Sequence, residues 1–152
     1  MGRTKPMVSK EYIVGLSDGE GCFYVNVGRS SLYRTGFKIQ LCFYIKMQEK
    51  DKSLLDKVKN TLNCGAVYFQ KEQRADHAQC YRYTVNSQED IFNVIIPFFS
   101  KYPLQSVLKR LNFGIFCQIA NLVKAKAHLT KDGVAKIKFL KARMNQRTVG
   151  LA

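Results

Sequence analysis

The stretch from Tyr12 to Gly21 constrains the fold more than any other part of this sequence. It reads Tyr-Ile-Val-Gly-Leu-Ser-Asp-Gly-Glu-Gly, an apolar run that ends in an acidic corner. Ser9 precedes the run and is a good N-cap residue, so the pattern predicts a helix. The helix is apolar almost all round, which predicts burial on more than one side. Gly15 lies in its middle, where glycine costs about 1 kcal/mol relative to alanine, and we infer that another backbone approaches closely there.

The end of this helix is predicted from its glycines. Gly19 and Gly21 bracket Glu20, so the helix should end there and turn out with Glu20 at its tip. Taken alone, the segment has an equally simple interpretation, a buried helix with a glycine cap and a solvated glutamate.

The charge of the chain points to an anionic partner. The net charge is +14, from 25 basic and 11 acidic residues among 152. Such an excess in a small folded domain most often indicates nucleic-acid binding, and a merely basic protein is the alternative. No stretch approaches the roughly 20 apolar residues of a membrane-spanning helix, and residues 1–7 look like a flexible basic arm with no signal-peptide core. The five cysteines form no metal-binding spacing, which predicts free thiols in a reducing intracellular compartment.

Four stretches alternate like strands. The clearest are Cys22–Val27 and Phe37–Met47, each with apolar residues on one face and polar residues on the other. The loop between them is rich in Gly, Ser and Arg. Shorter strands are predicted at 66–70, with Phe69 inward, and at 80–85.

Helical patterns follow the strands. Asp51 should cap a second helix, and Ser87 should begin a third that Pro97 closes, leaving residues 98–103 as a connector. A fourth helix is predicted from Leu104 to about residue 125, and Thr130 should cap a last one. The inward residues predicted for the fourth helix are Val107, Leu108, Leu111, Ile115, Phe116, Ile119 and Leu122.

The predicted order is helix, two strands, helix, two strands, helix, and then more helix. It favours a single α+β domain over residues 1–152, with a four-stranded antiparallel sheet packed on helices by one face.

Part of the first helix resembles a known family motif. Gly15, Leu16, Asp18, Gly19, Glu20 and Gly21 fall on the motif of the LAGLIDADG homing endonucleases, with mild departures at positions 14 and 17. Segments 43–58, 101–106 and 128–145 are also similar to organellar, intron-encoded members. The resemblance implies the αββαββα fold, a curved sheet that saddles DNA, and a place in an organelle, the mitochondrion.

The resemblance also implies roles for the motif residues. Two such helices pack across a two-fold axis, so the expected dimer interface comprises Tyr12, Gly15, Leu16 and Asp18. The last acid of the motif, Glu20, and the backbone carbonyl of Gly19 are the expected ligands of a divalent metal.

One acidic motif in the chain predicts a homodimer, because cutting two strands requires a carboxylate for each. Two adjacent Glu20 side chains would repel, and Mg²⁺ with its preference for oxygen ligands would remove that penalty. Where the family has a catalytic lysine and a glutamine, this sequence departs by one position. We propose Lys109 as the catalytic cation, with Lys101 as the fallback, and Gln48 as a residue that positions water; ordinary surface roles are the alternative for all three.

The predicted DNA contacts lie on the polar face of the strands and in the first loop. They are Tyr24, Asn26, Arg29, Ser30, Tyr33, Arg34, Lys38, Gln40, Tyr44, Lys46, Tyr68 and Gln70. Arg82 belongs to the same set if no bulge reverses the alternation of its strand. Groups of this kind can distinguish bases in the major groove.

The predicted function is therefore a Mg²⁺-dependent, site-specific DNA endonuclease that cuts both strands of a long pseudo-palindromic target. The same fold used as an intron RNA maturase or as a non-cleaving DNA-binding protein is the first alternative. An unrelated basic protein of a ribonucleoprotein is the second.

Overall fold

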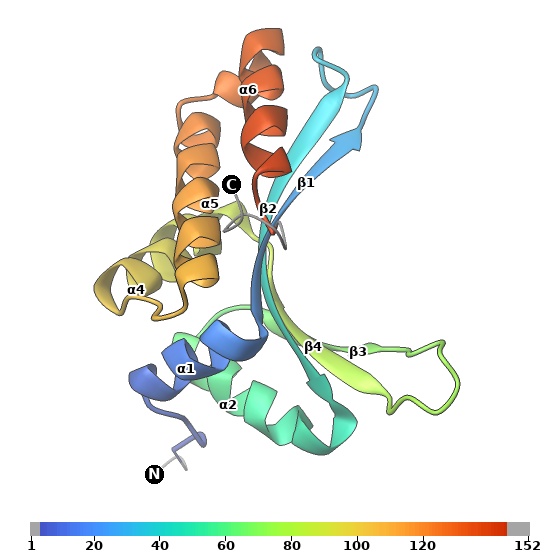
Figure 1. The fold of residues 1–152 in the computed structure, drawn as a ribbon, viewed down its shortest axis with the longest axis vertical. Helices are drawn as coiled ribbons and strands as arrows, with labels where there is room; N and C mark the ends of the chain where they lie inside the picture. The colour runs from blue at the N-terminus through green and yellow to red at the C-terminus, as the bar shows by residue number, and fades with distance from the viewer. Residues whose placement is uncertain (1–3, 146–152) are drawn as a thin grey trace.

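A computed structural model describes residues 4–145 of the chain (Figure 1). Its elements are α1 (Lys10–Glu20), β1 (Gly21–Arg29), β2 (Phe37–Gln48), the 3-10 turn η1 (Glu49–Asp51), α2 (Lys52–Leu62), β3 (Ala66–Gln70), β4 (Cys80–Val85), α3 (Gln88–Asp90), the π-helical turn η2 (Ile91–Ile95), α4 (Ile96–Lys101), α5 (Val107–Lys124), the 3-10 turn η3 (Ala127–Leu129) and α6 (Lys131–Ala142). The predicted α+β order is confirmed.

The N-terminal arm predicted for residues 1–7 lies partly outside the described residues. Residues 4–7 form neither helix nor strand. They are attached to α2, since Asn60 Nδ2 donates to the carbonyl of Pro6 at 2.9 Å.

The four strands form one antiparallel sheet in the order β1-β2-β4-β3. The sheet is strongly curved, and the helices lie on one side of it (Figure 1). The register places Phe43 between Phe23 on one neighbouring strand and Val85 on the other, so the apolar positions line up on one face. The long strand β2 outruns β4, because pairing with β4 extends only from Phe43 to Gln48 and residues 37–42 pair with β1 alone.

Phe23 lies at the centre of the core. Its ring centroid is 5.1–5.4 Å from those of four other phenylalanines, which come from β2, α4 and α5: Phe43, Phe99, Phe113 and Phe116. Phe23, Phe43, Phe99 and Phe116 are fully or almost fully buried. The aromatic cluster therefore fixes the sheet to the helices that cover it.

The helix starts predicted at Ser9, Ser87 and Thr130 are confirmed, and α5 has a cap of the same kind at Ser106, which was not predicted. The side chains of Ser9, Ser87, Ser106 and Thr130 each accept a backbone N–H from the first turn of the helix that follows. Asp51 lies at the N-cap position of α2, as predicted, but its side chain makes no capping bond.

The prediction that Pro97 closes the third helix is wrong. The chain passes through the π-helical turn η2, in which the N–H of Ile96 reaches back to the carbonyl of Ile91, and continues as α4 to Lys101. The wider turn shifts the hydrogen-bond pattern just before the proline, and Pro97 then occupies the first turn of α4, where its missing N–H costs nothing. Residues 98–101 are consequently helical.

Two predictions of inward-facing residues are also wrong. Helix α5 begins three residues later than predicted, and one side of its first two turns is uncovered, so that Val107 is 72% exposed and Leu108 and Leu111 are also exposed. Phe69 on β3 is 54% exposed and packs edge-on against Tyr81 with ring centroids 5.4 Å apart. The edge strand β3 extends beyond the helices, so alternation alone does not bury Phe69.

The five cysteines are free thiols, as predicted. Burial raises the pKa of Cys42 and of Cys117 to about 11. Among the described residues, no helix combines the length and the apolar character that crossing a lipid bilayer requires.

Truncating Phe23 should reveal its central position. We expect Phe23→Ala to lower the free energy of unfolding by about 3–5 kcal/mol, because it leaves a cavity among four rings. The matched control is Phe139→Ala, which removes an exposed ring from α6 and should change stability by less than about 0.5 kcal/mol. Urea denaturation measures both, and equal effects would contradict this account of the core.

Candidate active site and nucleic-acid surface

Helix α1 ends in an exposed acidic corner. Glu20 is its last residue, and Gly21 already has extended geometry and begins β1. A Cβ atom at Gly21 would lie 2.8 Å from the carbonyl oxygen of Ser17, a residue that is fully buried. Position 21 therefore requires glycine because the chain leaves the helix without space for a side chain.

The carboxylate of Asp18 ties this corner to the start of α5. It accepts the backbone N–H of Gln105 at 3.0 Å and that of Ser106 at 3.0 Å. These N–H groups stand at the amino end of α5, where donors lack partners within the helix and a negative charge is favourable. Asp18, predicted to belong to a dimer interface, thus also has a structural role within one chain.

Lys109 makes a second contact between α5 and this corner, at the first residue of β1. It lies on the first turn of α5, and its ammonium group donates to the carbonyl oxygen of Gly21. Glu20 is therefore held between two anchored residues, Asp18 and Gly21, with a positive charge one residue away. Lys101, the fallback cation, lies instead beside a separate hollow together with Gly15 and Asp18.

The corner has the donor types that a hard divalent cation prefers. The carboxylate of Glu20 is exposed, and the last carbonyl groups of a helix lack partners within it. The negative end of the helix dipole lies at the same point. Carboxylate and carbonyl oxygens fit Mg²⁺. Within residues 4–145, no group of three or more His, Cys, Asp or Glu side chains is close enough to hold a metal.

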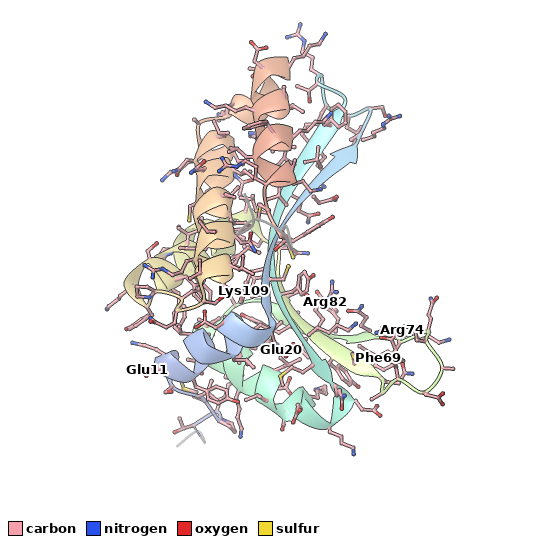
Figure 2. The ribbon with its side chains drawn as sticks, viewed as in Figure 1. Glu11, Glu20, Phe69, Arg74, Arg82 and Lys109 are labelled. Atoms are coloured by element: carbon pink, nitrogen blue, oxygen red, sulfur yellow. The ribbon has the colours of Figure 1, made fainter. Side chains whose placement is uncertain are left out.

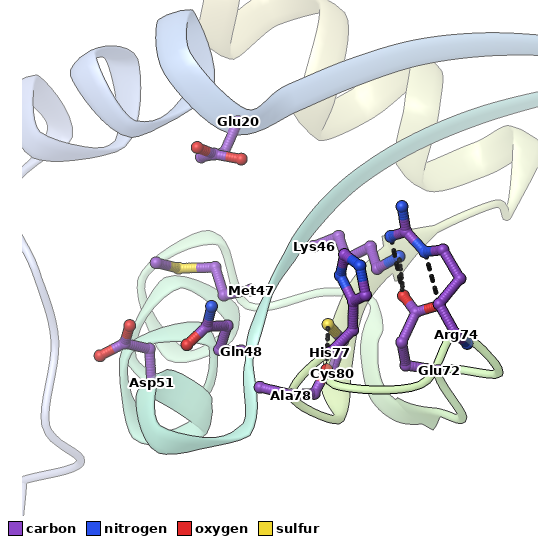
Figure 3. A pocket seen from close by; sticks show the side chains of 10 residues that line it. All are labelled: Glu20, Lys46, Met47, Gln48, Asp51, Glu72, Arg74, His77, Ala78 and Cys80. Atoms are coloured by element: carbon purple, nitrogen blue, oxygen red, sulfur yellow. Dashed lines mark hydrogen bonds and ion pairs between the residues drawn. The ribbon is translucent and has the colours of Figure 1, made fainter.

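Glu20 faces a polar hollow of about 350 Å³ (Figure 3). Gln48, the predicted water-positioning residue, lines the same hollow from the end of β2, as do Lys46 and Asp51. The structure thus brings three of the predicted residues, Glu20, Gln48 and Lys46, around one space.

The predicted DNA contacts on the strands share one face of the sheet, opposite the core. The register pairs Asn26 with Gln40, and Lys46 with Arg82, which is in turn opposite Tyr68. Tyr24, Lys38, Tyr44 and Gln70 follow the same alternation. No bulge interrupts the pairing of β2 with β4, so Arg82 points outward, with its guanidinium carbon 3.9 Å from the centroid of the Tyr44 ring.

The other predicted contacts lie in the loop that joins β1 to β2. Arg29 ends β1, and Ser30, Tyr33 and Arg34 follow it. Ser30 N–H donates to the carbonyl of Gly36 at 2.9 Å, and Gly36 N–H donates to that of Tyr33 at 2.8 Å, which closes the loop as a compact turn.

One face of α1 is left partly unpartnered within the described chain, although Leu16 on this face packs against the core. Tyr12 is 46% exposed, Leu16 is half-buried, and no atom lies within 4 Å of a Cβ placed on Gly15. The opposite face, with Ile13 and Val14, is buried against the core. The burial on a second side and the close backbone approach expected at Gly15 are thus absent within one copy of residues 4–145.

A family model described as LAGLIDADG endonuclease matches residues 13–120, most of the chain. The chain belongs to this family. The match covers the acidic corner, all four strands and most of α5, so the assignment rests on far more than the motif.

Individual relatives extend this result. A protein of Podospora anserina, described as an uncharacterized 50.9 kDa protein in ND4 intron 1, is 35% identical over 122 residues, which are 79% of this chain and 25% of that protein. The chain spans only about a quarter to a third of the curated LAGLIDADG relatives it matches.

Solved LAGLIDADG structures confirm the fold. The homing endonuclease I-TnaI superposes with a TM-score of 0.84 at 29% identity, over 93% of this chain and 90% of the other. The LAGLIDADG homing endonuclease I-LtrWI, bound to its target DNA, gives a TM-score of 0.84 at 34% identity, over 96% of this chain and 46% of the other. This chain is thus similar to nearly the whole of one relative and to about half of another.

Sequence reasoning missed the internal contacts of the β3–β4 loop. Glu72, Arg74 and His77 line the hollow beside Glu20, although the sequence shows only a polar loop there. The available signal is the acid and base two residues apart, Glu72 and Arg74, which contact each other in the structure.

Removing the carboxylate at position 18 should weaken the tie between α1 and α5. We expect Asp18→Ala to cost about 1–2 kcal/mol of unfolding free energy, because two backbone N–H groups lose a charged acceptor. Urea denaturation measures the change. Asp56→Ala is the control, since Asp56 pairs only with Lys52 on the surface of α2 and should cost less than about 0.5 kcal/mol. Equal losses of unfolding free energy in the two variants would contradict a stabilising role for the bonds from Asp18 to the start of α5.

Proposed function

We propose that this chain is a site-specific DNA endonuclease that hydrolyses one phosphodiester bond in each strand of a duplex, with Mg²⁺ or another divalent cation. The observation that carries the proposal is the corner itself, where the exposed Glu20 directly precedes Gly21, whose carbonyl oxygen accepts a hydrogen bond from the ammonium group of Lys109. Membership of the LAGLIDADG family and the DNA in the I-LtrWI structure support it.

Each residue of the corner has a proposed task. Glu20 and the carbonyl of Gly19 would hold the cation, which when bound supplies Lewis acidity and a more acidic water. Lys109 would stabilise the negative charge that develops on the phosphate, since a fixed cation at a partly enclosed site needs little reorganisation. Gln48 would orient the attacking water with its amide.

The DNA would lie along the outer face of the sheet, with the loop after β1 reaching the outer bases. Arg and Lys suit guanine, whereas Asn and Gln suit adenine. The excess of positive charge, +14 for the whole chain, would attract the phosphate backbone.

We further propose that the second acid comes from a second copy of this chain. The partly unpartnered face of α1, with Tyr12, Gly15 and Leu16, would pack against its own copy and bring two Glu20 side chains together. The similarity to nearly all of the I-TnaI chain supports a unit of this size. A two-fold dimer implies a pseudo-palindromic target. A second motif within a longer chain is the competing arrangement.

The name of the Podospora relative places it in an ND4 intron. We propose by analogy that this chain is also encoded by an organellar intron and acts in the mitochondrion.

Replacing Glu20 by glutamine should separate binding from cleavage. A binding site is first selected from randomised duplexes in metal-free buffer and is then offered with Mg²⁺. We expect Glu20→Gln to bind this site as the wild type does and to cut it at least about a hundredfold more slowly, because the cation loses a charged ligand.

The control is Glu89→Gln, which changes an exposed acid at the start of α3 and should cut normally. Lys109→Met in the same assay should slow single-turnover cleavage without weakening binding. Full cleavage by Glu20→Gln would remove that residue from the mechanism. A wild-type protein that binds the site and never cuts would favour the non-cleaving binder, and preferential binding of intron RNA would favour the maturase.

Adding a methyl group at Gly15 should have opposite effects on folding and on association. We expect Gly15→Ala to stabilise the single chain by up to about 1 kcal/mol, through its helix propensity, and to weaken self-association at least about tenfold by separating the two backbones. Sedimentation equilibrium with and without DNA measures association.

Gly114→Ala is the matched control. Gly114 also lies inside a helix and has no atom within 4 Å of an added Cβ, so it should gain helix stability without changing association. Unchanged association in Gly15→Ala, or a monomer on the DNA, would contradict the proposed dimer.

A further inference from the structure

The β3–β4 loop contains a compact ion cluster next to the acidic corner. Arg74 donates to Glu72 through Nε at 3.0 Å and through Nη2 at 3.2 Å, one bond to each carboxylate oxygen. The ammonium group of Lys46 is 3.7 Å from the same carboxylate. Glu72 is only 11% exposed, whereas Arg74 is 67% exposed. The carboxylate is therefore the covered partner, and the guanidinium group faces outward.

The loop holds Glu72 in place through its backbone. The side-chain oxygen of Gln79 accepts the N–H of Glu72 at 2.9 Å, and the side-chain amide of Gln79 donates to the carbonyl of Glu72 at 3.4 Å. The backbone N–H of Arg74 also donates to the Glu72 carboxylate, at 3.2 Å. Together, the bonds from Arg74 lower the pKa of Glu72 to about 2. Their contribution to stability is thus present above the ordinary pKa of a glutamate and is lost only as the pH falls toward 2.

The form of the Arg74–Glu72 pair leaves half of the guanidinium group available. Pairing through Nε and Nη2 occupies one side of the planar group. The two N–H bonds at its end, one each from Nη1 and Nη2, remain directed outward as a parallel fork. A carboxylate behind the arginine thus fixes the direction of the fork without consuming it.

The cluster lies on the surface proposed to meet DNA. Glu72 lies two residues after the end of β3, and it contacts Lys46, which is on the outer face of β2. Arg74 and Arg82 lie along the arm of the sheet formed by β3 and β4 (Figure 2). Lys46, Glu72 and Arg74 line the hollow that Glu20 faces from its other side (Figure 3).

We propose that Arg74, oriented by Glu72, reads a guanine at a base pair close to the cut phosphates. This inference rests on the proposed function, because it requires DNA on the outer face. The end fork of an arginine matches two acceptors in one plane, which guanine presents in the major groove as O6 and N7. The shared hollow with Glu20 places the contact in the central part of the target.

A phosphate offers a similar pair of acceptors, but the cluster favours the base. Glu72 cancels much of the positive charge of Arg74, so the pair attracts an anion weakly. The pair still fixes the direction of the Arg74 fork. A fixed direction is important for bonding to the edge of a base, and less important for attracting the diffuse negative charge of the phosphate backbone. The remaining charge of Lys46 is available for the nearby backbone.

The test is a selection of bound duplexes from a randomised library in metal-free buffer, followed by sequencing and by measured affinities for single base changes. Wild type is compared with Arg74→Lys, Arg74→Ala, Glu72→Gln and Lys59→Ala. Lys59 is exposed on α2, so its substitution removes one charge from outside the cluster. Circular dichroism of each variant checks that it is folded.

We expect the wild type to prefer guanine strongly at one central position in each half of its site. Arg74→Ala and Arg74→Lys should both lose this preference, by roughly 5- to 150-fold, and leave the other positions unchanged. The lysine variant is the sharper test because it keeps the charge and lacks the planar fork. Glu72→Gln should relax the same position while binding unrelated DNA more tightly, since two cations are released. Lys59→Ala should leave every preference intact.

Three outcomes would overturn the inference. A wild-type consensus that Arg74→Lys and Arg74→Ala leave unchanged refutes it and leaves the proposed function standing. Arg74→Ala could instead lose affinity equally for all sequences, with the slope of log affinity against log salt concentration reduced in magnitude by about 0.9. That result would make Arg74 a phosphate contact. A wild type with no preference at any position would refute both the endonuclease proposal and the role of Arg74.

Discussion

The acidic corner depends on the carboxylate of Asp18, which bonds to backbone N–H groups 87 and 88 residues further along the chain. This one contact sets where α5 begins relative to the end of α1. Because Lys109 lies in the first turn of α5, the same contact also places its ammonium group at the carbonyl of Gly21. Glu20 needs no bond of its own to be positioned, since its neighbours on both sides are fixed. An exposed carboxylate can thus be both well placed and free to bind a ligand.

Two glycines of α1 illustrate different demands on the same residue type. Gly21 is required inside the chain, where the buried backbone of Ser17 leaves no room for a Cβ. Gly15 has free space around it within one copy, so nothing in the described fold requires it. Glycine lowers helix stability, and the proposed second copy would supply a reason for it at position 15, namely the close approach of another backbone.

The sequence was sufficient to predict most of the fold. Strict alternation in β1 and β2 defined both faces of the sheet, and Ser9, Ser87 and Thr130 located three helix starts. Local patterns failed where tertiary context decides the outcome. A π-helical turn carries the chain through Pro97, and one side of the first turns of α5 is uncovered within the described chain, so that Val107, Leu108 and Leu111 are exposed. The position of Lys109 was predicted through family resemblance, whereas the Glu72–Arg74 pair could not be, because it depends on how an irregular loop folds back on itself.

The unequal lengths of β2 and β4 have a consequence for how such a protein can change. Residues 37–42 of β2 pair with β1 alone, and this two-stranded end carries Lys38 and Gln40 opposite Gly28 and Asn26. The acidic corner, in contrast, adjoins the part of the sheet that has all four strands. Substitutions at the tip of the hairpin therefore disturb few of the contacts that hold Glu20 and Lys109. If the proposed function holds, the hairpin tip could change the DNA sequence that it contacts while the geometry around Glu20 and Lys109 stays the same.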